Sequence, residues 1–276
     1  MTDALFQLTD ALFELMDVIF VQANGNFIGF FGHYRITFDQ MKPFKFKEFT
    51  VHQDQCAMKV GTDGVLLGAW ASLYHQPETI LDVGAGTGLI ALQMAQRSTA
   101  KTIDAIELDE SAYEQCVANF EASHWADRLF CYHAGFDEFV DEIEDKYDLI
   151  VSNPPFYTEE MGSGDTSRDQ ARQSSSLPFD ELLKGVSGLL SEAGLLSVII
   201  PYKEEQKFVE LATASGLHPN RITRVKGNPN TNFKRSLMEF GFQKVETYID
   251  ELVIEEERHQ YTKEYIELTQ SFYIKM

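Results

Sequence analysis

Cysteine is scarce in this sequence. Its 276 residues include three cysteines, Cys56, Cys116 and Cys131, which are far apart and form no C-x-x-C pair. An odd, widely spaced set does not make a disulfide framework, and it lacks the close ligand pairs of a structural zinc site. We therefore expect reduced thiols and no bound metal.

Long apolar runs are also missing. No stretch approaches the roughly 18 consecutive apolar residues that a membrane-spanning helix needs. Acidic residues, rather than a basic segment, stand before the first apolar positions, which argues against a secretory signal. The expectation is a cytoplasmic protein without a membrane partner.

Cations are outnumbered. The chain has 23 Lys and Arg against 43 Asp and Glu, and its net charge of −20 would slow its encounter with a polyanion. A nucleic acid would have to meet a local basic surface, and the acid-free residues 221–235 offer one. Their cations are Arg221, Arg224, Lys226, Lys234 and Arg235. One alternative is that these cations neutralise neighbouring acids. Another is that RNA approaches a second face, formed by Lys42, Lys45, Lys47 and Lys59.

A glycine-rich turn follows an apolar strand pattern. Residues 80–89 read ILDVGAGTGL, in which Asp82 leads into Gly84, Gly86 and Gly88. This is not the G-x-G-x-x-G spacing of nicotinamide-binding turns, so a pyrophosphate cofactor is disfavoured. The alternating glycines after an acid resemble motif I of the class I S-adenosylmethionine-dependent methyltransferases. A glycine-rich strand-to-helix turn of any α/β protein is the alternative.

Two downstream features favour the methyltransferase interpretation. Residues 102–109, TIDAIELD, form a second strand pattern about twenty residues after the turn, and Glu107 in it could accept both ribose hydroxyls of a cofactor. Residues 147–156, YDLIVSNPPF, run from an apolar strand pattern into an Asn-Pro-Pro-aromatic sequence. This sequence could be a plain turn, because proline fixes φ and extends the residue before it. It is also the signature of amino-methyltransferases.

Strand and helix patterns alternate with short joints, which is typical of parallel βαβ units. Strands are expected near 79–83, 102–107, 128–133, 147–152, 194–201, 217–226 and 233–242. Helices are expected near 88–97, 110–122, 136–143, 178–190 and 203–214. The pattern predicts an α/β, Rossmann-like fold, and the resemblance at motif I implies that it is the class I methyltransferase fold. Its seven-stranded, mostly parallel sheet would have a final antiparallel strand and helices on both faces. Ligands belong at the carboxyl ends of such strands.

The methyltransferase domain is expected to span residues 41–245. Within it, residues 41–75 would form a hairpin and a helix capped by Thr62 or Asp63, and would cover the cofactor's open side. Residues 246–276 are interpreted as an acidic C-terminal tail with a helical pattern at 263–270. The tail would pack through Tyr261, Tyr265, Leu268 and Phe272.

Residues 1–40 form an N-terminal extension of unclear role. A heptad repeat places four leucines on one helical stripe. They are Leu5, Leu8, Leu12 and Leu15. Either Met41 opens the working protein, or the extension is a docking segment.

The polar segment 157–176 lacks any period, and a loop of this length inside a compact domain is usually functional. Arg168 and Arg172 share one face if the segment becomes helical. We interpret it as a lid or target-contacting loop, with plain disorder in the unliganded protein as the alternative.

With these motifs, the chain resembles the bacterial methyltransferases that modify N6 of the adenosine next to the anticodon of a valine tRNA. The resemblance covers about residues 42–276 and includes FKEFTVHQD at 46–54, AMKVGTDGVLLGAW at 57–70 and KRSLMEF at 234–240. It implies S-adenosylmethionine as cofactor and adenosine 37 of tRNA(Val) as target. It further implies a monomer that binds neither a metal nor a membrane.

The resemblance also implies roles for individual residues. Cofactor-binding residues would be Asp82, Gly84, Gly86, Gly88, Glu107, Phe136, Asp137 and Asn153. At motif III the usual acid is out of register, so either Phe136 stacks on the cofactor's adenine or Asp137 takes the acid's place. Catalytic residues would be Asn153, Pro154, Pro155 and Phe156. Arg168 and Arg172 would join the basic run in contacting tRNA.

Two other functions remain open from the sequence. The Asn-Pro-Pro-Phe chemistry also serves protein-glutamine N5-methyltransferases, which normally carry a helical substrate domain ahead of the core. The third possibility is a non-catalytic RNA-binding module on the same fold, against which the intact Gly84, Glu107 and Asn153 argue.

Overall fold

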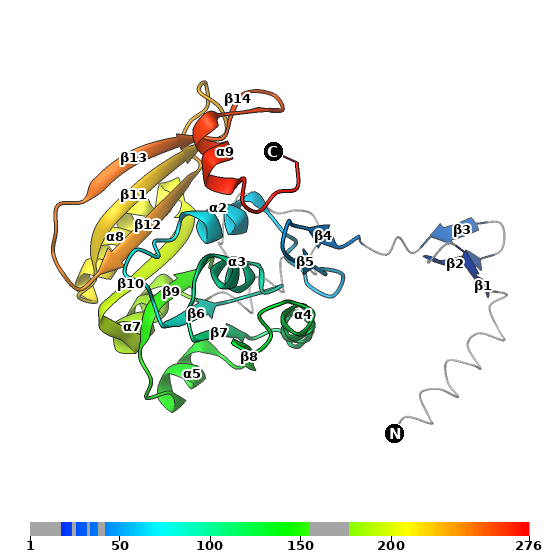
Figure 1. Ribbon diagram of the computed structural model, residues 1–276, viewed down its shortest axis with the longest axis horizontal. Coiled ribbons are helices and arrows are strands. Elements are labelled where there is room, and N and C mark those ends of the chain that lie inside the picture. Colours follow the sequence, from blue (N-terminus) through cyan, green and yellow to red (C-terminus); the bar gives the residue numbers. More distant parts are fainter. Residues whose placement is uncertain (1–17, 24–25, 32–33, 38–41, 155–176, 276) are drawn as a thin grey trace. The chain divides into compact units, whose positions relative to one another are not determined.

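A computed structural model describes residues 18–23, 26–31, 34–37, 42–154 and 177–275. The chain divides into two compact units, Met1–Lys42 and Pro43–Met276. The second unit holds the main sheet, its helices and every predicted site residue that the structure describes (Figure 1).

The described part of the first unit is a three-stranded antiparallel sheet. Its strands are β1 Val18–Ala23, β2 Asn26–Phe31 and β3 Tyr34–Thr37. β-Branched and aromatic residues are frequent in them, as suits a pleated surface. The leucine stripe expected over Leu5, Leu8, Leu12 and Leu15 lies outside the described residues.

A chain that begins at Met41 is expected to melt at the parent's temperature and to keep the parent's activity. The second unit has its own sheet and its own buried cores, so it does not need the first unit for burial. Thermal unfolding followed by circular dichroism, together with an activity assay, checks this. Loss of a cooperative melt in the shortened chain would make residues 1–40 part of the fold.

The main sheet has eight strands in the order β13-β11-β12-β10-β9-β6-β7-β8. They are β6 Thr79–Val83, β7 Thr102–Glu107, β8 Leu129–His133, β9 Tyr147–Ser152, β10 Leu190–Pro201, β11 His218–Lys226, β12 Arg235–Gly241 and β13 Tyr248–Val253. β12 runs antiparallel to β10 and β11, and the other pairings in this sheet are parallel. The expected mostly parallel sheet with one antiparallel strand is confirmed. That strand, β12, is not the final one as expected, because β13 is an additional, parallel strand beyond the expected seven.

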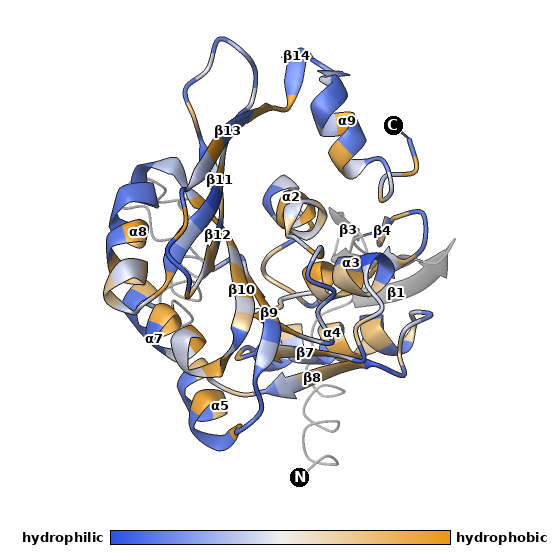
Figure 2. Ribbon diagram, turned by 60° about the vertical axis from the view of Figure 1, so that its left-hand side comes forward, coloured by the Kyte–Doolittle hydropathy of each residue, from blue (hydrophilic) through white to orange (hydrophobic). Residues whose placement is uncertain are grey.

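Helices cover both faces of this sheet (Figures 1 and 2). They are α2 Thr62–Trp70, α3 Leu89–Arg97, α4 Glu110–Glu121, α5 Phe136–Glu142, α7 Phe179–Leu189 and α8 Glu205–Ala214. Ile80 and Leu149 face one core with residues of α2, α3 and α4. Leu81 and Ile150 face the other core with residues of α5, α7 and α8. Successive strand residues therefore bury on opposite faces, and each buried Leu or Ile contributes about 1.5–3 kcal/mol.

The C-terminal residues belong to the same compact unit. After β13, which pairs parallel with β11, the chain forms a small hairpin and a helix. These elements are β14 Glu255–Glu257, β15 Gln260–Tyr261 and α9 Lys263–Thr269. Tyr265 and Phe272 are buried in the core that contains α2 and α3, whereas Tyr261 is 41 % exposed. The expected helix is present, and the region expected as an acidic tail also supplies a sheet strand.

The segment before the main sheet forms a short hairpin and a helix, as expected. The hairpin strands are β4 Phe44–Lys45 and β5 Thr50–Val51. The expected cap by Thr62 or Asp63 is wrong: Gly61 is the N-cap of α2, and no side chain caps the helix. Thr62 is already the first helical residue, and Asp63 instead forms an ion pair with Arg235 at 2.7 Å.

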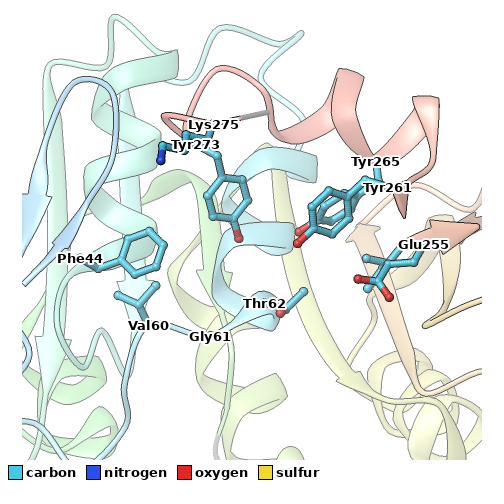
Figure 3. Close-up of a pocket in the computed structure, with 10 residues that line it drawn as sticks. Phe44, Val60, Gly61, Thr62, Glu255, Tyr261, Tyr265, Tyr273 and Lys275 are labelled. Atoms are coloured by element: carbon cyan, nitrogen blue, oxygen red, sulfur yellow. The ribbon is translucent and has the colours of Figure 1, made fainter. Parts of the chain in front are cut away.

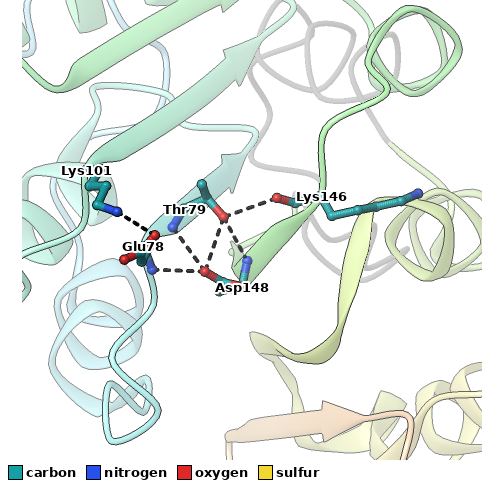
Figure 4. Close-up of polar contacts among 5 residues, drawn as sticks. All are labelled: Glu78, Thr79, Lys101, Lys146 and Asp148. Carbon is teal, nitrogen blue, oxygen red and sulfur yellow. Dashed lines mark hydrogen bonds and ion pairs between the residues drawn. The ribbon is translucent and has the colours of Figure 1, made fainter.

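Asp148 ties β9 to β6 at the amino-terminal edge of the sheet. Its carboxylate accepts hydrogen bonds from the backbone amides of Glu78 and Thr79 at 2.9 and 3.3 Å (Figure 4). It also accepts one from the Ser191 hydroxyl at 2.9 Å. Burial raises the pKa of Asp148, but these donors and nearby His75 outweigh it, so the pKa lies below the usual value. Asp148 thus stabilises β6 and β9 at the ends opposite to Gly84 and Asn153.

Candidate active site

The turn between β6 and α3 depends on its glycines. Gly84, Gly86 and Gly88 have φ values of +74°, +56° and +77°, a region that L-residues with side chains rarely adopt. A β-carbon at Gly88 would lie 2.6 Å from the Phe120 ring, so Gly88 is needed for packing. A β-carbon at Gly84 would meet nothing within 4 Å. The backbone at Gly84 therefore faces open space, which fits a ligand that lies close against the turn.

Glu107 ends β7 and is oriented toward this turn. Its two carboxylate oxygens accept hydrogen bonds from the amides of Gly86 at 2.8 Å and Asp109 at 2.9 Å. Each oxygen keeps a second lone pair, which could accept a ligand hydroxyl. The next residue, Leu108, is 52 % exposed. It is not among the residues predicted from the sequence, although an apolar residue directly after a strand-ending acid is a signal that could have indicated it.

Asp82 supports the turn from within the protein. It is 0 % exposed, and its Oδ2 accepts a hydrogen bond from the amide of Ala91 in α3 at 3.0 Å. Its Oδ1 has no hydrogen-bond partner among the described residues. Burial, only partly offset by the Ala91 amide, raises the pKa of Asp82 to about 7. The side chain thus joins the end of β6 to the first turn of α3.

Replacing Asp82 with asparagine is expected to make stability less dependent on pH. An acid whose pKa is raised by folding makes the protein less stable as the pH rises. The loss occurs between the pKa of the acid in the unfolded state, near 4, and its pKa in the folded state, about 7. This loss is at most ~4 kcal/mol by linkage, and asparagine does not titrate. The melting temperature of Asp82→Asn minus that of the parent should therefore rise between pH 4 and 7 and level off above it. A difference that does not change with pH would contradict the raised pKa.

The two candidates after β8 differ in burial. Phe136 is 8 % exposed, and a β-carbon at Gly185 in α7 would lie 2.4 Å from its ring. Phe136 therefore packs between α5 and α7 in the core. Asp137 is exposed at the start of α5, on the carboxyl side of β8. Of the two alternatives for the adenine contact, Asp137 is the side chain open to a ligand.

The Asn-Pro sequence follows β9 beside the glycine turn. Val83 and Ser152 are paired across β6 and β9, and the Ser152 hydroxyl donates to the Val83 carbonyl at 2.9 Å. Asn153 and Gly84 are the next residues on the two strands, so they leave the sheet side by side. Asn153 is half-buried and Pro154 is buried. Pro155, Phe156, Arg168 and Arg172 lie outside the described residues.

Asn119 of α4 fastens the segment that passes over the turn. Its side-chain oxygen accepts from the His52 amide, and its Nδ2 donates to the carbonyls of His52 and Thr87, each at 2.9 Å. Further along this segment, the sulfur of Cys56 would lie 3.8 Å from a β-carbon at Gly86. Asn119 is not among the residues predicted from the sequence. The signal that could have indicated it is a polar amide on the buried side of a helix, because buried polar groups are generally hydrogen-bonded.

Most of the predicted basic surface is neutralised by acids from other parts of the chain. Arg224 donates to both carboxylate oxygens of Glu205, with a shortest distance of 2.7 Å. Lys226 pairs with Glu251 of β13 at 2.9 Å. Arg235 pairs with an acid of α2, as described above. The sequence is acid-free in this run, but its neighbours in space are not, so the alternative of local charge neutralisation applies to these three cations.

The two other cations of the run differ from each other. Arg221 donates to the Trp70 carbonyl at 2.8 Å, and its guanidinium carbon lies 3.7 Å from the Trp70 ring centroid. This cation is thus used for packing α2 against β11. Lys234 is exposed, and its ammonium group has no partner among the residues that the structure describes.

Among the described residues, every helix is too short or too polar to span a membrane. Within the same ranges, no group of His, Cys, Asp and Glu side chains could hold a metal ion.

The strand order, with the glycine turn after β6 and the Asn-Pro sequence after the adjacent β9, is that of a class I methyltransferase. The family model described as methyltransferase small domain matches residues 64–176. The fold is also that of a solved structure, described as a predicted O-methyltransferase from Agrobacterium tumefaciens. That structure has a TM-score of 0.56 and 19 % identity, over 76 % of this chain and 96 % of the other.

Closer relatives define the family. A protein of Christiangramia forsetii is 62 % identical over 237 residues, which are 85 % of this chain and 99 % of the relative. A protein of Flavobacterium johnsoniae is 61 % identical over 84 % of this chain and all of the relative, and one of Bacteroides fragilis is 44 % identical over 84 % and 98 %. All three are named tRNA1(Val) (adenine(37)-N6)-methyltransferase. This chain belongs to that family.

Proposed function

We propose that this protein transfers a methyl group from S-adenosylmethionine to N6 of adenosine 37 in a valine tRNA, in the cytoplasm. The observation that carries the proposal is the position of Asn153, directly beside the open glycine turn at Gly84. Relatives that are 62 % identical and are named for this reaction support it.

Several side chains suit the cofactor. S-adenosylmethionine supplies an activated methyl group when it is bound. Gly84 and Gly86 leave room above the turn, and Glu107 can accept hydrogen bonds from the ribose hydroxyls through its free lone pairs. Asp137 can accept from the adenine, and Leu108 can cover one face of it. Asp82 and Asn119 act indirectly, because they hold the turn and the covering segment.

The target amine needs help because its lone pair is delocalised into the adenine ring. The side-chain oxygen of Asn153 and the carbonyl of Pro154 can both accept a hydrogen bond from this amine. Two such acceptors draw the nitrogen toward tetrahedral geometry and localise its lone pair. Proline holds the chain rigidly, so the acceptors are in place before the reaction. The amine becomes acidic once methylated, so it can release its proton afterwards without a strong general base.

Phe156 is proposed to stack on the target base. An adenosine in a tRNA loop must leave its stack to reach a pocket, and an aromatic ring is the common support for such a base. Pro155 would fix the distance between this ring and Asn153.

The two alternative functions lack a comparable observation. A glutamine methyltransferase is disfavoured because relatives that are 62 % identical are named for adenosine methylation in a tRNA. A non-catalytic module would not require the open space at Gly84 or the oriented Glu107.

The test is an assay with purified protein, labelled S-adenosylmethionine and a tRNA(Val) transcript. The expected product is one N6-methyladenosine per tRNA, identified by mass spectrometry of the nucleosides. A transcript with guanosine at position 37 is the matched control and should gain no label. Methylation of a glutamine peptide instead, or of neither substrate, would contradict the proposal.

A further inference from the structure

Two adjoining cavities lie where the C-terminal elements meet the start of α2. The larger has a volume of about 450 Å³ and the smaller about 330 Å³. Both are lined by Thr62 and Ile254, so they form one groove. A volume of this size is in the range that holds small organic ligands.

This groove lies at the edge of the sheet that carries the proposed active site. Arg235, which lines it, opens β12 and is paired with Pro201 at the carboxyl end of β10. β10 runs parallel to β9, whose last residue, Ser152, precedes Asn153. Ser152 is paired with Val198, so Asn153 is level with Ile199, two residues before Pro201. Adjacent strands are about 4.8 Å apart and successive strand residues about 3.3 Å, so the backbones at Arg235 and Asn153 are separated by roughly 12 Å. A polymer that is bound at Asn153 can therefore extend into the groove.

The larger part of the groove is aromatic. The rings of Tyr261 and Tyr265 have centroids 5.1 Å apart, and Figure 3 shows their hydroxyls directed toward the hydroxyl of Tyr273. Burial raises the pKa of Tyr265 and of Tyr273, so both present neutral hydroxyls. The carboxylate of Glu255 lies beside Tyr261 (Figure 3). A flat ring with an amino group would find an aromatic face at Tyr261 and an acceptor at Glu255.

Cations stand at both ends of the groove. Lys275 lines the aromatic part and Lys234 lines the narrower part. Both side chains are exposed, and neither ammonium group has a partner within the described ranges. In a chain with a net charge of −20, two unpaired lysines flanking an aromatic cavity favour an anionic ligand with a planar ring.

We propose that this groove binds an unstacked nucleotide of the substrate RNA, next to the target adenosine, an inference that rests on the proposed function. The base lies against Tyr261 and presents an amino group to Glu255. The phosphates on its two sides contact Lys234 and Lys275. Aromatic stacking combined with flanking cations is how proteins hold single-stranded nucleic acid.

The first test measures tRNA binding by the full chain at several salt concentrations, without methyl transfer. Stacking of one base is worth about 1–3 kcal/mol, so Tyr261→Ala should weaken binding about 5- to 100-fold, and Tyr261→Phe should restore it. Lys234→Glu and Lys275→Glu should each lower the slope of log affinity against log salt by roughly one. The affinity for S-adenosylmethionine should stay near the parent value.

The matched controls are Tyr248→Ala and Lys184→Glu. Tyr248 is 62 % exposed and opens β13, whereas the groove lies beyond the other end of this strand. Lys184 is an exposed lysine of α7. Neither lines the groove, so both variants should bind tRNA as the parent does. Equal losses in the controls and in the groove variants would overturn the proposal, because they would reflect general surface effects.

A second test asks whether a base touches Tyr261. A transcript with an abasic site on one side of adenosine 37 should bind the parent more weakly but show no further loss with Tyr261→Ala, as in a double-mutant cycle. Full additivity at both neighbouring positions would overturn the proposal. If Tyr261→Ala kept the parent's tRNA affinity but had a lower melting temperature, Tyr261 would have only a packing role in the protein, and the proposal would be overturned. Because binding is measured separately, failure of the parent to methylate tRNA would bear on the proposed function alone.

Discussion

Asn153→Ala is expected to lower kcat for tRNA methylation by about 100- to 1,000-fold, the loss typical of removing one preorganised polar group. The amide acts on the target amine as it reacts, so the loss should appear in kcat more than in KM. Affinity for S-adenosylmethionine, measured by calorimetry, should stay within a small factor of the parent. Single-turnover methylation of a tRNA(Val) transcript measures the rate.

Asn153→Asp is the matched variant. Its carboxylate keeps an acceptor oxygen in the same place, so it should retain more activity than Asn153→Ala. Near-normal turnover by the alanine variant would show that the Asn-Pro-Pro-Phe sequence is only a turn. Loss of cofactor binding in both variants would assign Asn153 to the cofactor rather than to the amine.

Gly86→Leu should weaken the binding of S-adenosylmethionine by about 100-fold or more. A leucine at this position would extend from the turn into the space beside Cys56, and overpacking of about 3 kcal/mol corresponds to that factor. Titration calorimetry gives the dissociation constant. An unchanged constant would remove the glycine turn from the cofactor site.

Backbone strain is the competing explanation, because Gly86 has a positive φ. Gly216 is a suitable control: its φ is +81°, and a β-carbon there would meet nothing within 4 Å. Gly216→Leu carries the same kind of strain, about 1–2 kcal/mol, at the end of α8. It should lower the melting temperature and bind the cofactor normally.

The sequence predicted the central strands well because their pattern is local. Apolar runs bounded by glycine, acid or proline located β6, β7 and β9 at the expected residues, and the motifs at their ends then follow from parallel strand order. Burial could not be predicted in the same way. Phe136 and Asp137 are adjacent in the sequence, and only the packing of α7 shows that the ring is covered.

The ion pairs of the basic run could not be predicted from the sequence either. Arg224 and Lys226 stand in an acid-free run, but their partners Glu205 and Glu251 come from α8 and β13. β13 itself was missed because it carries acids and lies at the edge of the sheet. Edge strands commonly carry charge, which prevents pairing with other molecules. The periodicity of such a strand is too weak to separate it from a solvated tail.

The contact between the β4–β5 hairpin and the residues after α9 has a consequence for synthesis. The amide of Lys47 donates to the Phe272 carbonyl at 2.9 Å, and Phe46 forms a β-bridge with Tyr273. These partners are more than 200 positions apart, so the loop between them closes at a high entropic cost. The hairpin therefore cannot dock until Phe272 and Tyr273 have left the ribosome. A messenger that ends a few codons before them would yield a chain whose β4–β5 hairpin lacks these contacts, even though every catalytic codon had been translated.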